Sequence, residues 1–506
     1  MKTNFLKNGL DPLVHQTLEC WHVPGLALAV VSGDEVLHLA GYGQRDPTRG
    51  LPVTPDTLFP IASMTKSFAV MSFGLLVDES KLEWDKPVRT YLPSWRMHEP
   101  VLTETLTVRD MLSHRSGLPS HDWIWWGSDF GRRDLLARLR HLEPNAPIRS
   151  RFQYNNVLYM LASLIVEDIS GMSWERFVQT RIFDVLGMKR SNFSTQITQQ
   201  DPDHSRPHVY RDGLLRECTF WEQDENSVTG AAGSINSCAS ELTTWLTLQM
   251  NAGNVGQRQF VKPETLETMH QPNIFIDDPQ ARRRFGYEFS SYGMGWFLRS
   301  HKGQMLISHG GSINGFWCTQ YFMPRHRLGV VALSNGDEGR NAAPVIISLT
   351  LFDRLLGLEP TDWDALMTES YAEAAAAEKK AKEELLACRI SGAQPAHPLA
   401  TYVGEYEHPG YGHLSVHLRE VSLQMVMNDR KTFALTLAHD DIFDAHEPDW
   451  DDRLKLTFIA DTRDRIGSLS IPLENAVADI VFVRQAEVDA NTTVAEVDGM
   501  KGIGHC

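Results

Sequence analysis

The stretch IASMTKSFAV, residues 61–70, places Ser63 three positions before Lys66 at the start of an apolar segment. Between residues 65 and 82 the apolar side chains are too dense for a helix with one buried side, so the pattern predicts a helix packed between two layers. Residues three apart are neighbours on a helix, which puts the Ser63 hydroxyl beside the Lys66 amine. Ser-x-x-Lys arises by chance about once or twice in a chain of this length. An ordinary helix start is therefore the alternative at this point.

A hydroxyl beside an amine at a helix N-terminus is a usable catalytic pair. Serine is a poor nucleophile until a base takes its proton, and a lysine removed from water has a lowered pKa that suits it to this task. The helix N-terminus also directs backbone N–H groups at a developing oxyanion. Ser63 is thus a candidate nucleophile with Lys66 as its candidate base.

Two later segments carry groups that complement this pair. Tyr154 and Asn156 stand at the start of a second apolar helix predicted over 152–171, and His309 precedes two glycines on a strand-like segment over 305–324. A phenol can shuttle a proton, an amide can hold a substrate amide, and glycines allow a substrate backbone close to the strand. Each residue also has a structural interpretation, as a helix cap, a core tyrosine or a turn histidine.

Strand-like segments stand at both ends of this region. Residues 23–43 predict a hairpin that turns at Ser32-Gly33-Asp34, and further strands are predicted within 305–324 and over 328–335. A long helical middle separates them. This order predicts an α/β or α+β domain whose sheet is built from both ends of the segment.

The composition changes at residues 369–387, where an Ala/Glu/Lys-rich run predicts a semi-rigid helical linker. Short alternating segments over 402–484 then predict a small antiparallel barrel or sandwich. A chain of 506 residues exceeds what one hydrophobic core supports. The predicted parts are a catalytic domain at 1–360, a helical linker at 361–398, a barrel domain at 399–486 and a loose tail at 487–506.

The composition excludes several classes of partner. A net charge of −16 argues against binding nucleic acid, which requires a concentrated basic surface. No apolar stretch is long enough to span a membrane, and the N-terminus lacks the pattern of a signal peptide, so we expect a cytoplasmic protein. The six cysteines are expected to be reduced thiols, and no residue set has metal-ligand spacing. We expect no metal and no cofactor, a small-molecule or short-peptide substrate, and an oligomer as an open possibility.

The ordered segments SMTK, YNN and HGG, with LSHRSGLP, GAAGSINSCASEL and YGMGW in between, resemble the serine β-lactamase and penicillin-binding-protein superfamily. The pattern is most similar to the class C-like branch, which contains D-aminopeptidases, D,D-carboxypeptidases, esterases and amide hydrolases. The resemblance covers roughly residues 10–355 and implies an antiparallel sheet flanked by helices with an all-helical region. Residues 402–484, which begin with YVGEY, resemble the lipocalin-like C-terminal barrel of some peptidase members.

The resemblance implies a role for each residue of the three segments. Ser63 would be the nucleophile, Lys66 would assist its deprotonation, Tyr154 would carry the proton to the leaving group and Asn156 would orient the acyl amide of the substrate. The backbone N–H groups of Ser63 and Ser312 would form the oxyanion hole. Whether Lys66 or Tyr154 is the base is left open, because strongly coupled groups titrate jointly.

The resemblance also implies a substrate-binding strand formed by His309, Gly310 and Gly311. His309 stands where many relatives carry a lysine, and an imidazole is mostly neutral at pH 7, so a substrate carboxylate is attracted less. Trp123, Trp125 and Trp126 could line an apolar acyl pocket, although simple packing is an equal alternative.

We therefore expect a serine hydrolase that cleaves an amide of a small peptide, with a possible preference for a D-residue. An esterase, an acyltransferase or a peptide cyclase using the same acyl-enzyme is the second hypothesis. A binding or scaffold protein that has lost turnover is the alternative of another class.

Overall fold

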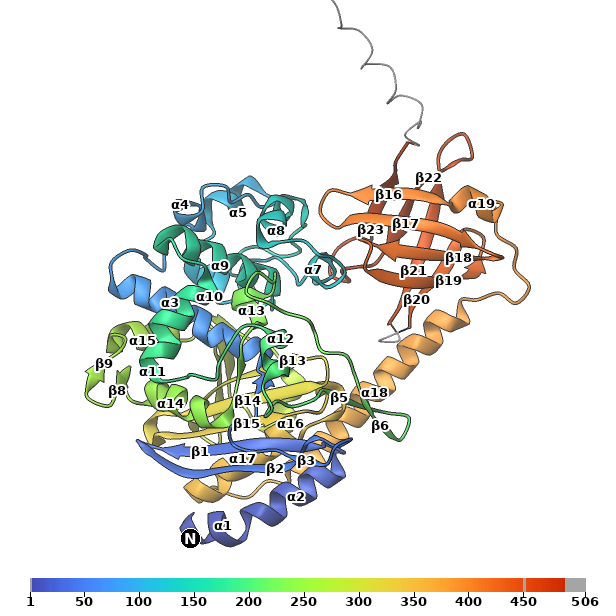
Figure 1. Ribbon diagram of the computed structural model, residues 1–506. Coiled ribbons are helices and arrows are strands. Elements are labelled where there is room, and N and C mark those ends of the chain that lie inside the picture. The colour runs from blue at the N-terminus through green and yellow to red at the C-terminus, as the bar shows by residue number, and fades with distance from the viewer. Residues whose placement is uncertain (1, 449–451, 487–506) are drawn as a thin grey trace, which may run out of the picture. The chain divides into compact units, whose positions relative to one another are not determined.

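The structure is a computed structural model that describes residues 2–448 and 452–486. The predicted tail at 487–506, which includes Cys506, lies outside these residues. The described residues divide into two compact units, one ending at Ala381 and the other beginning at Lys382 (Figure 1).

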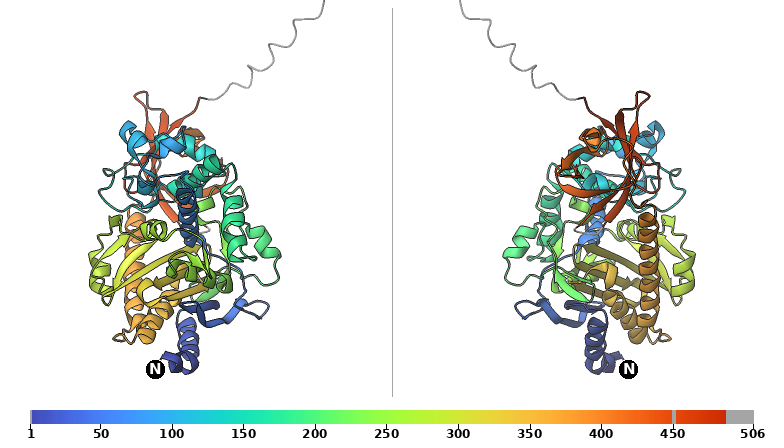
Figure 2. Two further views of the ribbon diagram at one scale, coloured as in Figure 1. Left: turned by 90° about the vertical axis from the view of Figure 1, so that its left-hand side faces the viewer. Right: turned by 90° about the vertical axis from the view of Figure 1, so that its right-hand side faces the viewer.

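Both ends of the first unit contribute to one nine-stranded antiparallel sheet. Strand β1 near the N-terminus pairs with β15, with Leu26 opposite Ser334, and Figure 2 shows these N-terminal and C-terminal strands together from two sides. The sheet order is β10-β11-β12-β13-β14-β15-β1-β2-β3. The strands are β1 (Gly25–Ser32), β2 (Glu35–Asp46), β3 (Leu51–Pro52), β10 (Ile274–Phe275), β11 (Ser290–Tyr292), β12 (Phe297–His301), β13 (Gln304–Ile313), β14 (Phe316–Met323) and β15 (Leu328–Ser334). The predicted sheet built from both ends is confirmed.

Alternation of side chains along the strands gives the sheet two apolar faces. Leu306 and Tyr321 belong to a buried cluster with residues of α2, α17 and α18, and we call this side the α17 face. His309 and Gly311 are one position out of phase and lie on the opposite side, which we call the α3 face. The helices that complete the α17 face are α1 (Lys2–Asn8), α2 (Leu10–Cys20), α17 (Ala343–Leu356) and the start of α18 (Trp363–Ala387).

Helix α3 (Thr65–Asp78) is buried on all sides from Thr65 to Leu76, as its apolar density predicts. Phe68 stacks on Trp245 of α14 (Ala239–Met250) with 3.8 Å between ring centroids. The helix ends four residues earlier than predicted, and Ser80 just beyond it has a left-handed φ of 58°.

Further helices complete the first unit. Helix α9 (Asn156–Ser170) confirms the predicted helix but begins four residues later than residue 152, and Gly171 caps its C-terminal end. The segment that contains Trp123, Trp125 and Trp126 forms one helical turn, α7 (Trp123–Trp126). The other helices are α4 (Val88–Tyr91), α5 (Pro100–Thr105), α6 (Val108–Leu112), α8 (Arg132–Arg138), α10 (Trp174–Val178), α11 (Asp184–Leu186), α12 (Thr195–Gln200), α13 (Gly230–Gly233), α15 (Pro263–Met269) and α16 (Pro279–Phe285).

The second unit is a closed antiparallel barrel rather than a sandwich. Its eight strands are β16 (Gly404–His408), β17 (Gly412–Arg419), β18 (Ser422–Met427), β19 (Lys431–His439), β20 (Ile442–Glu447), β21 (Asp452–Ala460), β22 (Ile466–Ile471) and β23 (Ile480–Arg484). Strand β23 returns to pair with β16, so the sheet has no open edge. Tyr406, Leu414 and Phe482 are buried at alternate strand positions and help to fill the interior. The predicted C-terminal barrel is confirmed.

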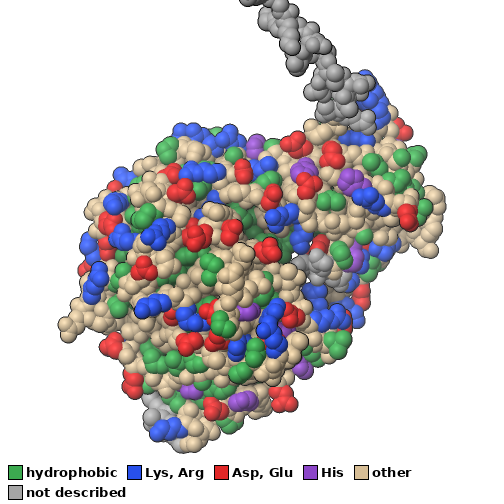
Figure 3. All heavy atoms as spheres, viewed as in Figure 1, with side chains coloured by type: hydrophobic (Ala, Val, Ile, Leu, Met, Phe, Trp, Pro, Cys, Tyr) green, Lys and Arg blue, Asp and Glu red, His purple; other side chains and the backbone are tan. Residues whose placement is uncertain are grey.

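The surface mixes charges of both signs. On the face shown in Figure 3, Lys and Arg side chains are interspersed with Asp and Glu. Within residues 2–448 and 452–486, no single helix is long and apolar enough to cross a bilayer; α9 and the segment Trp174–Leu186 reach the required length only together, across a bend of 71°.

Candidate active site

Ser63 lies in a turn of 3₁₀ helix, Ala62–Met64, immediately before α3. The preceding residue, Ala62, has a φ of 44°, a left-handed conformation that is strained for a residue with a Cβ atom. Strain of this kind persists only where the surrounding structure holds it, and it is concentrated at functional sites. The turn exposes part of Ser63 while its neighbours Ala62 and Met64 stay buried.

Lys66 is fully buried, and its amine contacts three oxygen atoms. Nζ donates to Ser63 Oγ at 2.9 Å, to Asn156 Oδ1 at 2.8 Å and to the backbone oxygen of Ala232 at 2.8 Å. A charged ammonium has three protons, so these contacts satisfy it completely. The oxygens of Asn156 and Ala232 can only accept hydrogen bonds. If Lys66 is neutral, the lone pair of its amine can therefore face only the Ser63 hydroxyl.

Burial lowers the pKa of Lys66 to about 7, against an opposing effect of the Asp122 carboxylate. The cause is the loss of water around the charged form. A lysine with this pKa is half neutral near pH 7, so it can take the proton of Ser63. The geometry and the protonation equilibrium thus favour the same proton transfer.

Tyr154 precedes α9 and places its phenol at the same point. Burial raises the pKa of Tyr154, while a hydrogen bond with Ser63 acts in the opposite direction. The Lys66 amine lies 4.8 Å from the centroid of the Tyr154 ring. The phenol is therefore protonated at neutral pH and lies beside both the hydroxyl and the amine. Such a group can pass a proton between them and a leaving group.

The side-chain amide of Asn156 has a single workable orientation. Its Oδ1 faces the amine of Lys66, and its Nδ2 donates to Asp122 Oδ1 at 3.2 Å. In the reverse orientation the Asn156 NH₂ group would face the Lys66 amine, donor against donor, and the Asn156 oxygen would face the Asp122 carboxylate, acceptor against acceptor. Asp122 also accepts from Trp125 Nε1 at 2.7 Å, which holds the carboxylate in place. Asp122, Asn156 and Lys66 thus form a continuous polar chain to Ser63.

His309 lies on the α3 face of β13 and is neutral. Burial and, to a smaller extent, the charge of Lys66 lower its pKa to about 3. Nδ1 lies 2.6 Å from the Gly310 oxygen, which can only accept, so Nδ1 carries the proton. Nε2 then accepts from the Tyr292 hydroxyl at 3.0 Å. This position therefore presents no fixed positive charge to a substrate.

The loop before α9 is attached to the segment LSHRSGLP by Asn155. Its Oδ1 caps α9 by accepting from Leu158 N at 2.8 Å, and its Nδ2 donates to the Pro119 oxygen. Its backbone N–H donates to His114 Nδ1 at 3.0 Å. Burial lowers the pKa of His114 well below its usual value, so this ring is neutral beside Tyr154. These contacts fix where Tyr154 and Asn156 emerge.

Gly311 lets strand β13 approach Ser63 closely. A Cβ atom there would lie 2.0 Å from the Ile61 oxygen and 2.8 Å from Ser63 N. Strand β12 pairs with β13 only up to Phe297 opposite Ser308, so residues 309–313 have no partner on that side. The strand edge beside Ser63 is therefore open to a substrate backbone.

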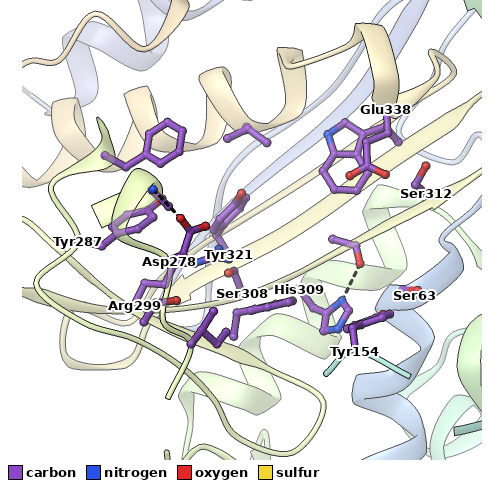
Figure 4. A pocket seen from close by; sticks show the side chains of 18 of the residues that line it. Ser63, Tyr154, Asp278, Tyr287, Arg299, Ser308, His309, Ser312, Tyr321 and Glu338 are labelled. Atoms are coloured by element: carbon purple, nitrogen blue, oxygen red, sulfur yellow. Dashed lines mark hydrogen bonds between the residues drawn. The ribbon is translucent and has the colours of Figure 1, made fainter. Parts of the chain in front are cut away.

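A cavity of about 680 Å³ follows this open edge (Figure 4). Its lining includes Ser63, Tyr154, Asn156, His309, Gly310 and Ser312, all of which are predicted from the sequence as site residues. Gly311 lies against the same turn, and Lys66 is buried behind Ser63. The structure thus gathers these predicted residues around one opening.

The three tryptophans predicted to form an acyl pocket lie on α7. Trp126 stacks on Trp221 with 4.6 Å between ring centroids, and Trp125 meets Trp221 edge to face. The cavity has other aromatic side chains in its wall, namely Phe285, Tyr287, Phe297, Trp317 and Tyr321. An acyl pocket formed by Trp123, Trp125 and Trp126 therefore stays a prediction.

Several polar groups at the site are absent from the sequence predictions. Asp122 is one aspartate in a Trp-rich segment, and nothing in its neighbours indicates a catalytic contact. His114 and the Ala232 oxygen lie in LSHRSGLP and GAAGSINSCASEL, so the order of those segments was the available signal. Arg299 also lines the cavity, and no feature of the sequence around it indicates this position.

Two family models match the chain. Residues 10–350 match the family described as "Beta-lactamase", and residues 389–485 match a "Domain of unknown function (DUF3471)". The first match spans the sheet and every residue of the site. The second spans the barrel.

Curated relatives are similar over most of the chain. The protein named "Unguisins hydrolase ungD'" from Aspergillus campestris is 28% identical over 441 residues, which cover 83% of this chain and 79% of the relative. "Unguisins hydrolase ungD" from Aspergillus violaceofuscus is 27% identical over 428 residues, covering 80% and 75%. "Protein flp" from Staphylococcus aureus is 24% identical over 346 residues, covering 66% and 64%.

Solved structures show the same fold. The octameric penicillin-binding protein homologue from Pyrococcus abyssi has a TM-score of 0.62 at 21% identity, with 93% of this chain and 99% of that chain covered. SurE has a TM-score of 0.55 at 19% identity, with 95% of this chain and 100% of the SurE chain covered. With Ser63, Lys66 and Tyr154 together in a matching fold, this chain belongs to the beta-lactamase family, within the superfamily of β-lactamases and penicillin-binding proteins.

Proposed function

We propose that the protein is a serine hydrolase that forms an acyl-enzyme on Ser63 and cleaves an amide bond of a small peptide or amide. The observation that carries the proposal is the buried amine of Lys66, 2.9 Å from Ser63 Oγ and with a pKa lowered to about 7. Burial of a charged lysine has a free-energy cost, and its use as a base explains why the fold tolerates it.

Acylation follows from this geometry. Neutral Lys66 takes the proton of the Ser63 hydroxyl as the oxygen attacks the substrate carbonyl. The oxyanion is stabilised by the backbone N–H groups of Ser63 and Ser312, which are proposed on the resemblance. Tyr154 gives its proton to the leaving nitrogen and regains one from the Lys66 ammonium. Water then attacks the ester, and the same groups act in reverse order.

The substrate class is proposed from the polarity of the site and from the relatives. Neutral His309 offers no ion pair to a carboxylate next to the scissile bond, which disfavours β-lactams and peptides cleaved at their terminal residue. The open edge of β13 suits an extended peptide backbone. Two relatives are named hydrolases of unguisins, which supports hydrolysis as the reaction. A preference for a D-residue is proposed on the resemblance.

An esterase, an acyltransferase or a peptide cyclase is the second proposal, because all of them share the acyl-enzyme. They differ in whether water or an amine receives the acyl group. Product analysis with an added amine separates them, since an acyltransferase yields the new amide in preference to the acid. A scaffold without turnover is less consistent with the strained Ala62 and the buried Lys66, which bring no benefit to binding alone.

The first experiment measures covalent labelling by intact mass. A fluorophosphonate should add one adduct to the parent protein and none to Ser63→Ala, while Ser67→Ala, which changes a buried neighbour on α3, should be labelled. Labelling that persists in Ser63→Ala would contradict the proposal.

A substrate panel then tests the reaction. Peptide amides with D- or L-residues at the scissile bond are compared with aryl esters of the same acyl groups. We expect Ser63-dependent hydrolysis of amides. Hydrolysis restricted to the esters would favour the esterase instead.

A further inference from the structure

The cavity beside Ser63 extends past the edge of β13 to the α17 face of the sheet. Ser308 pairs with Phe297 on β12 and with Tyr321 on β14, and Arg299 pairs with Ser290 on β11. Paired residues of antiparallel strands point to the same side, so these side chains share one face. We call this part of the cavity the Arg299 lobe, which is lined by Asp278, Phe285, Tyr287, Ser290, Arg299 and Tyr321.

Arg299 is the cationic residue in the wall of this lobe. Its guanidinium lies 4.7 Å from the ring centroid of Phe297 and 5.5 Å from that of Tyr287. Across residues 2–448 and 452–486, no hydrogen bond or ion pair joins it to another side chain. Aromatic rings on two sides limit its access to water and hold it toward the cavity (Figure 4).

Within the described residues, neither acid of the same wall forms an ion pair with Arg299. Asp278 caps α16 and accepts from Ala281 N at 2.8 Å. Glu338 lies beside Ser312, at the end of the cavity away from Arg299 in Figure 4. A half-buried guanidinium without a counter-ion is a site that an anion would complete.

We propose that Arg299 binds a carboxylate of the substrate in this lobe, remote from the scissile bond; the inference rests on the proposed acylation of Ser63. The planar guanidinium suits a bidentate contact with a carboxylate. Phe285, Tyr287 and Tyr321 surround the anion with aromatic surface. The substrate is therefore an acidic peptide or amide whose negative charge lies several residues from the bond that is cleaved.

The register of β13 sets the distance between the two groups. Gly311 lies against Ser63 N, whereas Arg299 is opposite Leu306, five residues along the strand. At about 3.3 Å per residue the separation along the strand is roughly 16 Å. A carboxylate next to the scissile bond cannot reach Arg299. The arrangement therefore selects a distant carboxylate and complements the neutral His309 beside the nucleophile.

The test uses two fluorophosphonate probes whose linkers end in a carboxylate or in a carboxamide. Two linker lengths are compared, one that spans the five strand residues and one shorter than a single residue. Intact mass gives the rate of Ser63 labelling for the parent, Arg299→Gln and Arg283→Gln. Arg283 is exposed on α16 and outside the cavity wall, so its variant is a matched control for loss of charge.

We expect the long carboxylate probe to label the parent about tenfold faster than the long carboxamide probe. This ratio should fall to about one in Arg299→Gln and persist in Arg283→Gln, and the short pair should show no preference. Equal rates for the long pair in the parent, or a preference retained in Arg299→Gln, would overturn the inference. If the Arg299 inference fails in this way but the carboxamide probe still labels Ser63 efficiently, the proposal that Ser63 is the nucleophile is still supported. If neither probe labels Ser63, the proposed function fails and the inference fails with it.

Discussion

Lys66 determines the electrostatics of the site at the scale of single residues. The titratable groups that face it are Asp122, His114, His309, Tyr154 and Tyr159. Both imidazoles are neutral at pH 7 and both phenols stay protonated, because burial lowers the pKa of each histidine and raises that of each tyrosine. Asp122 is thus the group that opposes the burial of Lys66. The protonation state of Lys66 depends on this one carboxylate and on the exclusion of water.

The pH dependence of Ser63 labelling tests this balance. Because the proposed base is the neutral amine, the labelling rate should rise with pH through a midpoint near the Lys66 pKa of about 7. Asp122→Asn removes the charge that raises this pKa, so the midpoint should move to lower pH. Labelling rates between about pH 5 and 9 measure both midpoints.

Asp129→Asn is the matched control for this pH shift. Asp129 is exposed in the same segment, so its substitution should leave the midpoint in place. An unchanged midpoint in Asp122→Asn would show that the carboxylate only positions Asn156.

The close approach at Gly311 predicts that adding a single methyl group there will slow the labelling of Ser63. In Gly311→Ala the new methyl would meet backbone atoms of Ile61 and Ser63, which cannot move as a flexible side chain can. The strand must shift away from Ser63, so Ser63 labelling should fall by at least about tenfold with the fold retained. Gly131→Ala, whose Cβ meets Asp134 Oδ2 at 3.5 Å, is the control and should be labelled normally. Normal labelling of Gly311→Ala would contradict the role of this contact.

At the scale of elements, Asp110 of α6 fixes the segment that leads from this helix to the site. The carboxylate closes a capping box with Thr107 and forms ion pairs with Arg115 and Arg149. The residue is fully buried, and its pKa is lowered by hydrogen bonds to Arg149 and Thr107 in spite of its burial. These contacts set the start of the segment LSHRSGLP, which Asn155 then joins to α9.

Asp110→Asn should therefore lower the free energy of unfolding by about 3 kcal/mol at pH 7, measured by urea denaturation. A depressed pKa means that the stabilisation is present above the unfolded value of about 4 and is lost as the pH falls through the folded value. The difference between the variant and the parent should accordingly shrink in acid. Asp134→Asn, at an exposed cap of α8, should cost less than about 1 kcal/mol. Equal losses in the two variants would contradict the importance of the buried network.

At the scale of the whole molecule, the chain consists of two cores. The first contains the nine-stranded sheet and the helices on both of its faces, and the second is the closed barrel. Helix α18 occupies much of the predicted linker and carries the chain from one unit to the other. Cores of this size are expected to unfold as separate cooperative units.

Calorimetry should therefore show two transitions. Tyr406→Ala, in the barrel core, should lower the midpoint temperature of the barrel transition, with a loss of about 3–5 kcal/mol in the free energy of unfolding. Trp245→Ala, which removes the ring stacked on Phe68 of α3, should lower the midpoint of the other transition. The barrel variant should retain Ser63 labelling below its transition. A single transition that moves with either substitution would show that the two units unfold as one.

Local patterns made much of this architecture predictable. Apolar density indicated that α3 is buried, and the order of strands and helices indicated a sheet assembled from both ends of the first unit. Ser63 and Lys66 are neighbours because they lie three positions apart, within one helical turn. The order of the later segments identified Tyr154, Asn156 and His309, but only through resemblance, since no local rule brings residues ninety or more positions apart into contact.

The sequence by itself determined the fold class, the two cores and the residue types available for acyl transfer, because these depend on periodicity, composition and chain order. The tertiary structure alone decided which of those groups meet and in what state of charge. Asp122 has no local signal, and it reaches Lys66 only through Asn156. Arg299 enters the cavity because β12 is paired in register with β13. The lowered pKa of Lys66 depends on enclosure by α9 and α13, and burial is a property of packing that a linear pattern does not contain.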